Sequence, residues 1–261
     1  MVRLQLIGGG RMGEALLAGV LDSGWATPGD VRVVELSDAR RDELASRFGG
    51  IALGAEPGPA DGTVIAVKPQ HVDDAVRSVV AAGSTRLLSI AAGIPLARLE
   101  AAAGSGVRVV RAMPNTPSLV GAGVAAVSGG SAADEADVTW ATELLGAVGE
   151  VVVLPEHQLD AVTGLSGSGP AYVFLVAEAL IDAGVLVGLP RDVATTLATS
   201  TLLGSARLLA ETGDGPADLR AAVTSPGGTT AAGVRELERH AVRAAIADAV
   251  VAATERSREL A

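Results

Sequence analysis

Gly8-Gly9-Gly10-Arg11-Met12-Gly13 follows a short apolar run and opens a segment whose apolar side chains recur at helical spacing. The glycines at positions 8, 10 and 13 fit the pattern G-x-G-x-x-G. In this pattern the first glycine permits a tight turn, the second lets a pyrophosphate approach the backbone, and the third lets the helix pack on the strand. The N-terminus of the helix offers free N–H groups to phosphate. The segment therefore predicts a strand, a dinucleotide-binding loop and a helix.

Strands and helices alternate over the first 155 residues. Runs rich in Val, Leu and Ile predict further strands at 31–34, 63–67, 86–90, 107–112, 124–127 and 151–154. After residue 155 only helical patterns follow, at 158–165, 170–187, 191–211 and 229–259, the last broken near His240. Alternation of this kind is typical of a parallel sheet with helices on both faces. We predict an α/β chain with a Rossmann-like doubly wound domain at 1–155 and an all-helical domain at 156–261.

Composition narrows the classes of function. The net charge is −10 and the arginines are scattered, so the chain lacks the basic stripe expected of nucleic-acid binders. Cysteine is absent, which excludes disulfides and cysteine-ligated metals, and we expect no metal site. The most apolar helix, at 171–189, contains Glu178 and Asp182, so we expect it to be buried in an interface and not to span a membrane. The first residues do not predict a signal peptide, and we expect a cytoplasmic protein.

The end of the second predicted strand bears on the choice between NAD and NADP. An acidic residue about 20 positions beyond the glycine loop binds the ribose 2′-hydroxyl of NAD, whereas a nearby arginine accommodates the phosphate of NADP. Glu35 favours NAD, while Ser37, Arg40 and Arg41 offer groups for a phosphate. Spacing alone leaves both cofactors open.

Four further segments place polar or small residues at strand ends or helix starts. Lys68 is the only lysine and ends a strand in Ala66-Val67-Lys68-Pro69, and the segment 111–117 follows another strand. Ligands bind at this edge of open α/β sheets. Segments 166–172 and 223–230 combine hydroxyls with glycines at helix starts, where N–H groups suit a carboxylate. The alternative interpretation is that the last two segments are only helix caps with glycine turns.

Together these segments resemble those of pyrroline-5-carboxylate reductases, nearly from end to end. The matching motifs are the glycine loop, AVKP at 66–69, SIAAG at 89–93, RAMPNTP at 111–117, SGSGPAY at 166–172 and VTSPGGTT at 223–230. The resemblance implies reduction of the cyclic imine 1-pyrroline-5-carboxylate to L-proline, the last step of proline biosynthesis. It implies NADPH as the donor, with NADH as an alternative. It also implies a homodimer with interlocked helical domains, or a higher assembly such as a decamer.

The resemblance also assigns residues to each ligand. Together with Arg40 from the spacing argument, the residues expected to bind the dinucleotide are Ile7, Gly8, Gly9, Gly10, Arg11, Met12, Gly13, Ser37, Ala66, Val67, Lys68, Pro69, Ile90, Ala91, Ala92 and Asn115. Those expected to bind the substrate are Ser225, Gly228, Thr229 and Thr230. Thr230 is the expected catalytic residue, as the hydrogen-bond partner of the ring nitrogen. Residues 53–58 lack the asparagine that the family often has there, and Glu35 leaves the use of NADH open.

The residues of the two candidate substrate loops agree with imine chemistry. An imine nitrogen is basic enough to be protonated near neutral pH, so a strong general acid is less necessary than in ketone reduction. Neither 166–172 nor 223–230 contains His, Asp, Glu or Lys. Hydroxyls, backbone dipoles and proximity would then orient the substrate. For His71, His157 and His240 a surface or capping role is favoured over acid catalysis.

Two other functions are compatible with a dinucleotide loop. A β-hydroxyacid dehydrogenase of the same two-domain fold would need a lysine in the helical domain, and residues 156–261 contain none. A dinucleotide-sensing protein without turnover is the third alternative, although nothing in the sequence disables the site. The fold by itself does not decide among them.

Overall fold

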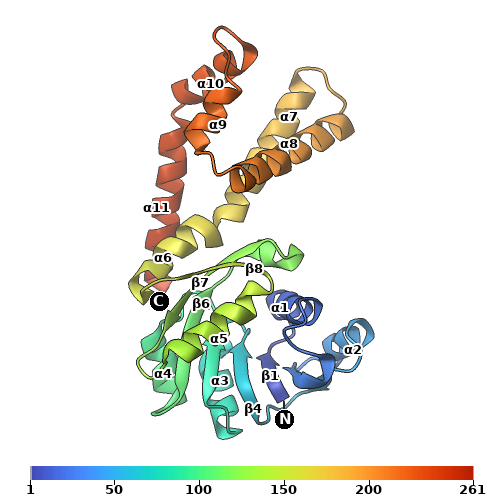
Figure 1. Ribbon diagram of the computed structural model, residues 1–261, viewed down its shortest axis with the longest axis vertical. Coiled ribbons are helices and arrows are strands. Elements are labelled where there is room, and N and C mark those ends of the chain that lie inside the picture. The colour runs from blue at the N-terminus through green and yellow to red at the C-terminus, as the bar shows by residue number, and fades with distance from the viewer. Residues whose placement is uncertain (1, 261) are drawn as a thin grey trace. The chain divides into compact units, whose positions relative to one another are not determined.

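The computed structural model describes residues 2–260 (Figure 1). Packing divides them into two units, one of residues 2–168 with 252–260, and one of residues 169–251. The last strand ends at Val153, and only helical segments follow among the described residues. Helix α6 (Leu159–Val162) and the π-helical turn Thr163–Gly167 still pack within the first unit. The boundary between the two packed units, after residue 168, therefore lies later in the chain than the boundary at residue 155 that the sequence pattern predicts.

One sheet of eight strands organises the first unit, within the described residues, in the order β3-β2-β1-β4-β5-β6-β7-β8. The strands are β1 (Val2–Ile7), β2 (Val31–Val34), β3 (Ala52–Gly54), β4 (Ala60–Ile65), β5 (Arg86–Ser89), β6 (Arg108–Met113), β7 (Gly123–Gly129) and β8 (Gly149–Val153). Neighbours pair in parallel except β6 and β7, which are antiparallel. The order reverses between β1 and β4, which places a ligand crevice at their carboxyl ends. The predicted doubly wound fold is confirmed.

Helices cover both faces of this sheet (Figure 1). The five helices are α1 (Arg11–Asp22), α2 (Asp38–Arg47), α3 (Val72–Ala81), α4 (Leu96–Ala103) and α5 (Glu135–Gly146). Side chains of α1, α2 and α5 pack in one core cluster with Leu4, Leu6 and Val33, while those of α3 and α4 pack in a second cluster with Ile7 and Val34. Alternate residues of a strand thus enter opposite cores, which is why these strands are rich in apolar residues on both faces.

The second unit is helical. Its helices are α7 (Gly169–Leu186), α8 (Arg191–Glu211), α9 (Pro216–Ala222), α10 (Thr229–Arg239) and most of α11 (Val242–Leu260). Ala241 has a φ of +54° and separates α10 from α11, which confirms the predicted break near His240. Helix α9 and the strand β3 were not predicted, because each is too short to show a clear period.

The second unit buries few of its apolar side chains. Among residues 169–251 only Ala194 and Ala198 are buried, whereas Phe174 and Leu175 of α7 are 63% and 66% exposed. The helical stretch Glu156–Leu186 also has the length and apolar character to cross a membrane, which by itself is weak evidence for a span. Exposed apolar patches of this kind mark contacts with other chains or membranes. We expect a second copy of the chain to cover α7 and α8.

This expectation predicts that a charge on α7 disrupts assembly. Phe174→Glu should weaken subunit association by more than about tenfold, because an unpaired carboxylate would be buried in the interface. Light scattering after size exclusion should show a smaller particle than the wild type. Val120→Glu is the matched control, since Val120 is 80% exposed and lies in the first unit. A wild-type mass for Phe174→Glu would contradict the expectation.

Candidate active site

Gly8, in the turn between β1 and α1, and Gly13, in the first turn of α1, have no room for a side chain. A Cβ atom on Gly8, whose φ is +100°, would lie 2.7 Å from the carbonyl oxygen of Ala66. A Cβ atom on Gly13 would lie 2.2 Å from the carbonyl oxygen of Gly8. Gly10 is different, since a Cβ atom there would meet nothing within 4 Å. No side chain caps α1 at Gly10, so the backbone at this helix N-terminus is open to a phosphate.

A cavity of about 600 Å³ opens beside this turn, at the carboxyl ends of β1 and β2. Residues after β1, β2, β3 and β4 form part of its wall, and one side of α3 forms the rest. The lining residues are Ile7, Gly8, Gly10, Val34, Glu35, Leu36, Ala55, Glu56, Pro57, Ala66, Val67, Lys68, His71, Asp74, Ala75, Ser78 and Val79. We call it the larger cavity. Its position and size suit the adenosine half of a dinucleotide.

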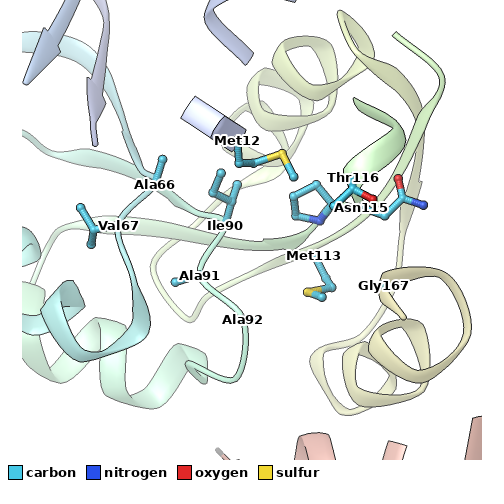
Figure 2. Close-up of a pocket in the computed structure, with 11 residues that line it drawn as sticks. Met12, Ala66, Val67, Ile90, Ala91, Ala92, Met113, Asn115, Thr116 and Gly167 are labelled. Carbon is cyan, nitrogen blue, oxygen red and sulfur yellow. The ribbon is translucent and has the colours of Figure 1, made fainter. Parts of the chain in front are cut away.

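A second cavity of about 270 Å³, the smaller cavity, lies at the ends of β4, β5 and β6 (Figure 2). Its lining residues are Met12, Ala66, Val67, Ile90, Ala91, Ala92, Met113, Pro114, Asn115, Thr116 and Gly167. None of them is titratable. Because Ala66 and Val67 also line the larger cavity, the two cavities adjoin at the end of β4. The pair suits the two halves of one dinucleotide, with the nicotinamide in the smaller cavity.

Glu35 stands on the wall of the larger cavity, directly after β2. Its carboxylate accepts hydrogen bonds from the N–H of Gly9 at 2.9 Å and from the N–H of Ser37 at 3.0 Å. The Ser37 hydroxyl in turn caps α2 by accepting from the N–H of Arg40. The side chain of Ser37 is therefore engaged in the helix start.

Arg40 is held by acceptors of the protein itself. Its Nε donates to the carbonyl oxygen of Gly9 at 2.7 Å, and its guanidinium pairs with Glu14 and Glu43. Burial is the largest single influence on Glu14 and raises its pKa, but the hydrogen bonds and charges of Arg40 and Arg47 together hold that pKa below its ordinary value. Hydrogen bonds from Arg40 to Glu43 and Glu14 raise the pKa of Arg40. The cluster fastens α2 to the glycine turn.

Asn115 joins three segments of the site. Its side-chain amide donates to the carbonyl oxygen of Ser166 at 3.1 Å, and its side-chain oxygen accepts from the N–H of Val124 at 2.9 Å. Glu156 acts nearby in a similar way, accepting from the N–H of Leu96 and from buried Arg111. These bonds hold the segment 156–167 against the ends of β6 and β7, and bring Gly167 to the smaller cavity.

The expected substrate residues lie in the second unit, before and at the start of α10. Gly227 has a φ of +71°, and the N–H of Gly228 donates to the carbonyl oxygen of Ser225 at 3.0 Å. A Cβ atom on Gly228 would lie 2.6 Å from the hydroxyl of Ser225. Thr229 and Thr230 form the first turn of α10, which no side chain caps. The turn therefore presents hydroxyls and backbone N–H groups together.

The expected cofactor residues divide into two groups. Those that line a cavity are Ile7, Gly8, Gly10, Met12, Ala66, Val67, Lys68, Ile90, Ala91, Ala92 and Asn115. Those that do not are Gly9, Arg11, Gly13, Ser37, Arg40 and Pro69. Gly9 and Gly13 shape the turn, Ser37 and Arg40 fasten α2, Arg11 is exposed at the start of α1, and Pro69 begins the turn before α3.

Other lining residues were absent from the expected set. The face of α3 that carries Asp74, Ala75 and Ser78 had no motif to mark it. Met113 and Thr116 lay within the motif at 111–117, and residues 55–57 lay within a stretch already compared with the family. Met113, Thr116 and residues 55–57 lie at or just after the end of a strand, and that position could have identified them.

Comparison with known proteins decides the family. The model of pyrroline-5-carboxylate reductase dimerisation matches residues 156–260, and that of NADP oxidoreductase, coenzyme F420-dependent, matches residues 3–93. A pyrroline-5-carboxylate reductase of Corynebacterium melassecola is 41% identical, over 100% of this chain and 99% of that protein. The chain belongs to the pyrroline-5-carboxylate reductase family. The resemblance of the sequence motifs is confirmed, and the protein is an oxidoreductase of this family.

Further relatives support the assignment to the pyrroline-5-carboxylate reductases. The protein of that name from Synechocystis is 44% identical, over 99% of this chain and 98% of its own. The solved reductase of Coxiella burnetii superposes with a TM-score of 0.92 at 34% identity, covering 100% of this chain and 98% of that one. The Plasmodium falciparum pyrroline carboxylate reductase, solved with NADP bound, has a TM-score of 0.87 at 29% identity, with coverage of 99% and 98%.

The glycine turn yields a paired prediction. Gly10→Ala should leave the free energy of unfolding unchanged, because its Cβ atom meets no protein atom, yet weaken dinucleotide binding by about tenfold or more, because that atom enters the phosphate path. Gly13→Ala should destabilise the fold by about 2 kcal/mol or more through overlap with Gly8. Denaturant unfolding and titration with NADPH measure the two effects. If Gly10→Ala bound NADPH as tightly as the wild type does, that result would contradict the placement of the phosphates beside Gly10.

Proposed function

We propose that this protein reduces 1-pyrroline-5-carboxylate to L-proline, with NADPH as donor and NADH as an alternative donor. The observation that carries the proposal is the adjoining pair of cavities at the glycine turn, in a chain that belongs to the pyrroline-5-carboxylate reductase family. A bound nicotinamide would supply the hydride for the imine carbon, and the nitrogen would end as the protonated secondary amine.

The smaller cavity supports this reaction by what its wall contains. Met12, Ile90 and Met113 give it an apolar surface that excludes water from the reacting atoms. Its polar side chains are those of Asn115 and Thr116, which carry no charge. An uncharged wall is suitable for an imine that is already basic, since no acid of the protein is needed to drive proton transfer.

The loop before α10 supports the choice of substrate. We propose that Ser225, Gly228, Thr229 and Thr230 bind the carboxylate and the ring, with the Thr230 hydroxyl hydrogen-bonded to the ring nitrogen. Two threonine hydroxyls and the free N–H groups of the first turn of α10 favour an anion. Gly228 has to be glycine because a side chain there would displace the Ser225 hydroxyl.

We also propose a homodimer in which α7 and α8 of two copies cover each other, with a decamer as the alternative higher assembly. The exposed apolar side chains of these helices support it, as does the dimerisation model that matches residues 156–260. The same burial would account for the apolar stretch 156–186 without a membrane. We propose that the protein acts in the cytoplasm on a small molecule, with no nucleic-acid or membrane partner.

The test is a turnover assay with purified protein, NADPH and pyrroline-5-carboxylate. The proposal predicts that NADPH is oxidised and that L-proline appears in equal amount. Binding of NADPH without turnover of the imine would instead favour a dinucleotide-sensing protein. Reduction of NADP+ to NADPH with a β-hydroxyacid as hydride donor, without imine reduction, would favour the dehydrogenase alternative.

Thr230 provides a prediction within this assay. Thr230→Val keeps the shape of the side chain but removes the hydroxyl, and should lower kcat/KM for the imine by about 10- to 100-fold, the usual effect of one lost hydrogen bond to a reacting group. NADPH affinity and unfolding should not change. Thr142→Val on α5 is the matched control, since its hydroxyl donates only to the carbonyl oxygen of Val138. Equal losses in both variants would argue against a role of Thr230 at the substrate.

A further inference from the structure

The wall of the larger cavity is acidic. Three carboxylates line it, those of Glu35, Glu56 and Asp74, against the single lysine Lys68 and the histidine His71. The 2′-phosphate of NADPH adds a charge of about −1.5 to −2 at neutral pH, as phosphate monoesters do. Like charges in a partly enclosed cavity repel one another, so this cavity discriminates against the phosphate more than an open surface would.

Glu35 follows β2 directly and accepts a hydrogen bond from Gly9 of the glycine turn, which is where an acidic residue meets the adenosine ribose in dinucleotide-binding sheets. The N–H groups of Gly9 and Ser37 fix its two oxygens, one each. A carboxylate has about four acceptor positions, so each oxygen keeps capacity for one further donor. Ribose hydroxyls can donate hydrogen bonds to these positions, whereas a fully ionised 2′-phosphate has no hydrogen to donate.

The arginines that would attract a 2′-phosphate are committed elsewhere. Arg40 donates to the carbonyl oxygen of Gly9 and pairs with Glu14 and Glu43. Arg41 donates to the carbonyl oxygen of Glu35 and pairs with Asp38. Neither arginine lines either cavity. A phosphate would have to draw one of them away from its carboxylates and displace the Glu35 side chain as well.

We propose that Glu35 is the residue that selects the cofactor and that it makes NADH bind at least as tightly as NADPH. Its carboxylate accepts the 2′-hydroxyl of the adenosine ribose and occupies the space that the 2′-phosphate would need. This inference deepens the proposed function, on which it rests for the use of a nicotinamide dinucleotide. It concerns the binding step alone and does not depend on which imine is reduced.

The test compares the dissociation constants of NADH and NADPH, measured by calorimetry on the full-length protein without any imine. The wild type should bind NADPH no more tightly than NADH. Glu35→Gln should shift the ratio of the two constants toward NADPH by tenfold or more, because it removes the charge and keeps the size. Glu35→Ser serves as a second variant and should shift the ratio in the same direction. Comparing two ligands on one sample separates selectivity from any loss of folded protein.

Glu56→Gln is the matched control, because Glu56 lines the same cavity beyond β3. It should change the ratio by less than threefold. The proposal is overturned if the wild type binds NADPH more than tenfold tighter than NADH, if both Glu35 variants keep the wild-type ratio, or if Glu56→Gln shifts it as far as Glu35→Gln does. A Glu35-dependent ratio in a protein that does not reduce pyrroline-5-carboxylate would uphold this inference and reject the proposed function.

Discussion

The contact between Gly13 and the carbonyl oxygen of Gly8 sets the geometry on which the cofactor half depends. Because only a hydrogen fits at Gly13, α1 can begin immediately beside the end of β1. Gly8 in turn lies against the carbonyl group of Ala66, which ties the turn to the end of β4. The two cavities share Ala66 and its neighbour Val67, so these close approaches also determine where the halves of a dinucleotide would meet.

Charge is distributed unequally between the two cavities. The larger cavity carries Glu35, Glu56, Asp74, Lys68 and His71, and electrostatics there can distinguish one dinucleotide from another. The smaller cavity is lined without a titratable side chain, which suits a reaction whose substrate is already basic. In the proposed reaction, selection of the cofactor and reduction of the imine are therefore the tasks of different cavities, joined by one glycine turn.

The strand and helix order was predictable because a parallel sheet buried on both faces leaves apolar runs that end at recognisable turns. The glycine turn was predicted in the same way, from glycines whose local geometry is constrained. β3 was not predicted, since three residues at the edge of a sheet are too few to show a periodic pattern of apolar side chains. The antiparallel pairing of β6 with β7 was also missed, because strand direction depends on the connection and not on side-chain pattern.

Site residues were predictable where a motif requires particular residue types. They were less predictable where packing alone brings a residue to the wall of a cavity. Spacing left Glu35 and Arg40 as equal candidates for the ribose end of the cofactor. The structure separates them, because the ion pair of Arg40 with Glu14 joins α2 to α1, which are distant in the sequence. Likewise Gly167 reaches the smaller cavity through bonds made by Asn115 and Glu156, which no local pattern reveals.

In the proposed reaction, hydride passes from the nicotinamide to the imine carbon of a cyclic substrate. Its most direct measurement uses reduced cofactor carrying deuterium at the transferred position of the nicotinamide ring, with unlabelled pyrroline-5-carboxylate and analysis of the product by mass spectrometry and NMR. Each L-proline should carry one deuterium, on the ring carbon that formed the C=N bond. L-Proline without deuterium, or oxidised cofactor without L-proline, would contradict it.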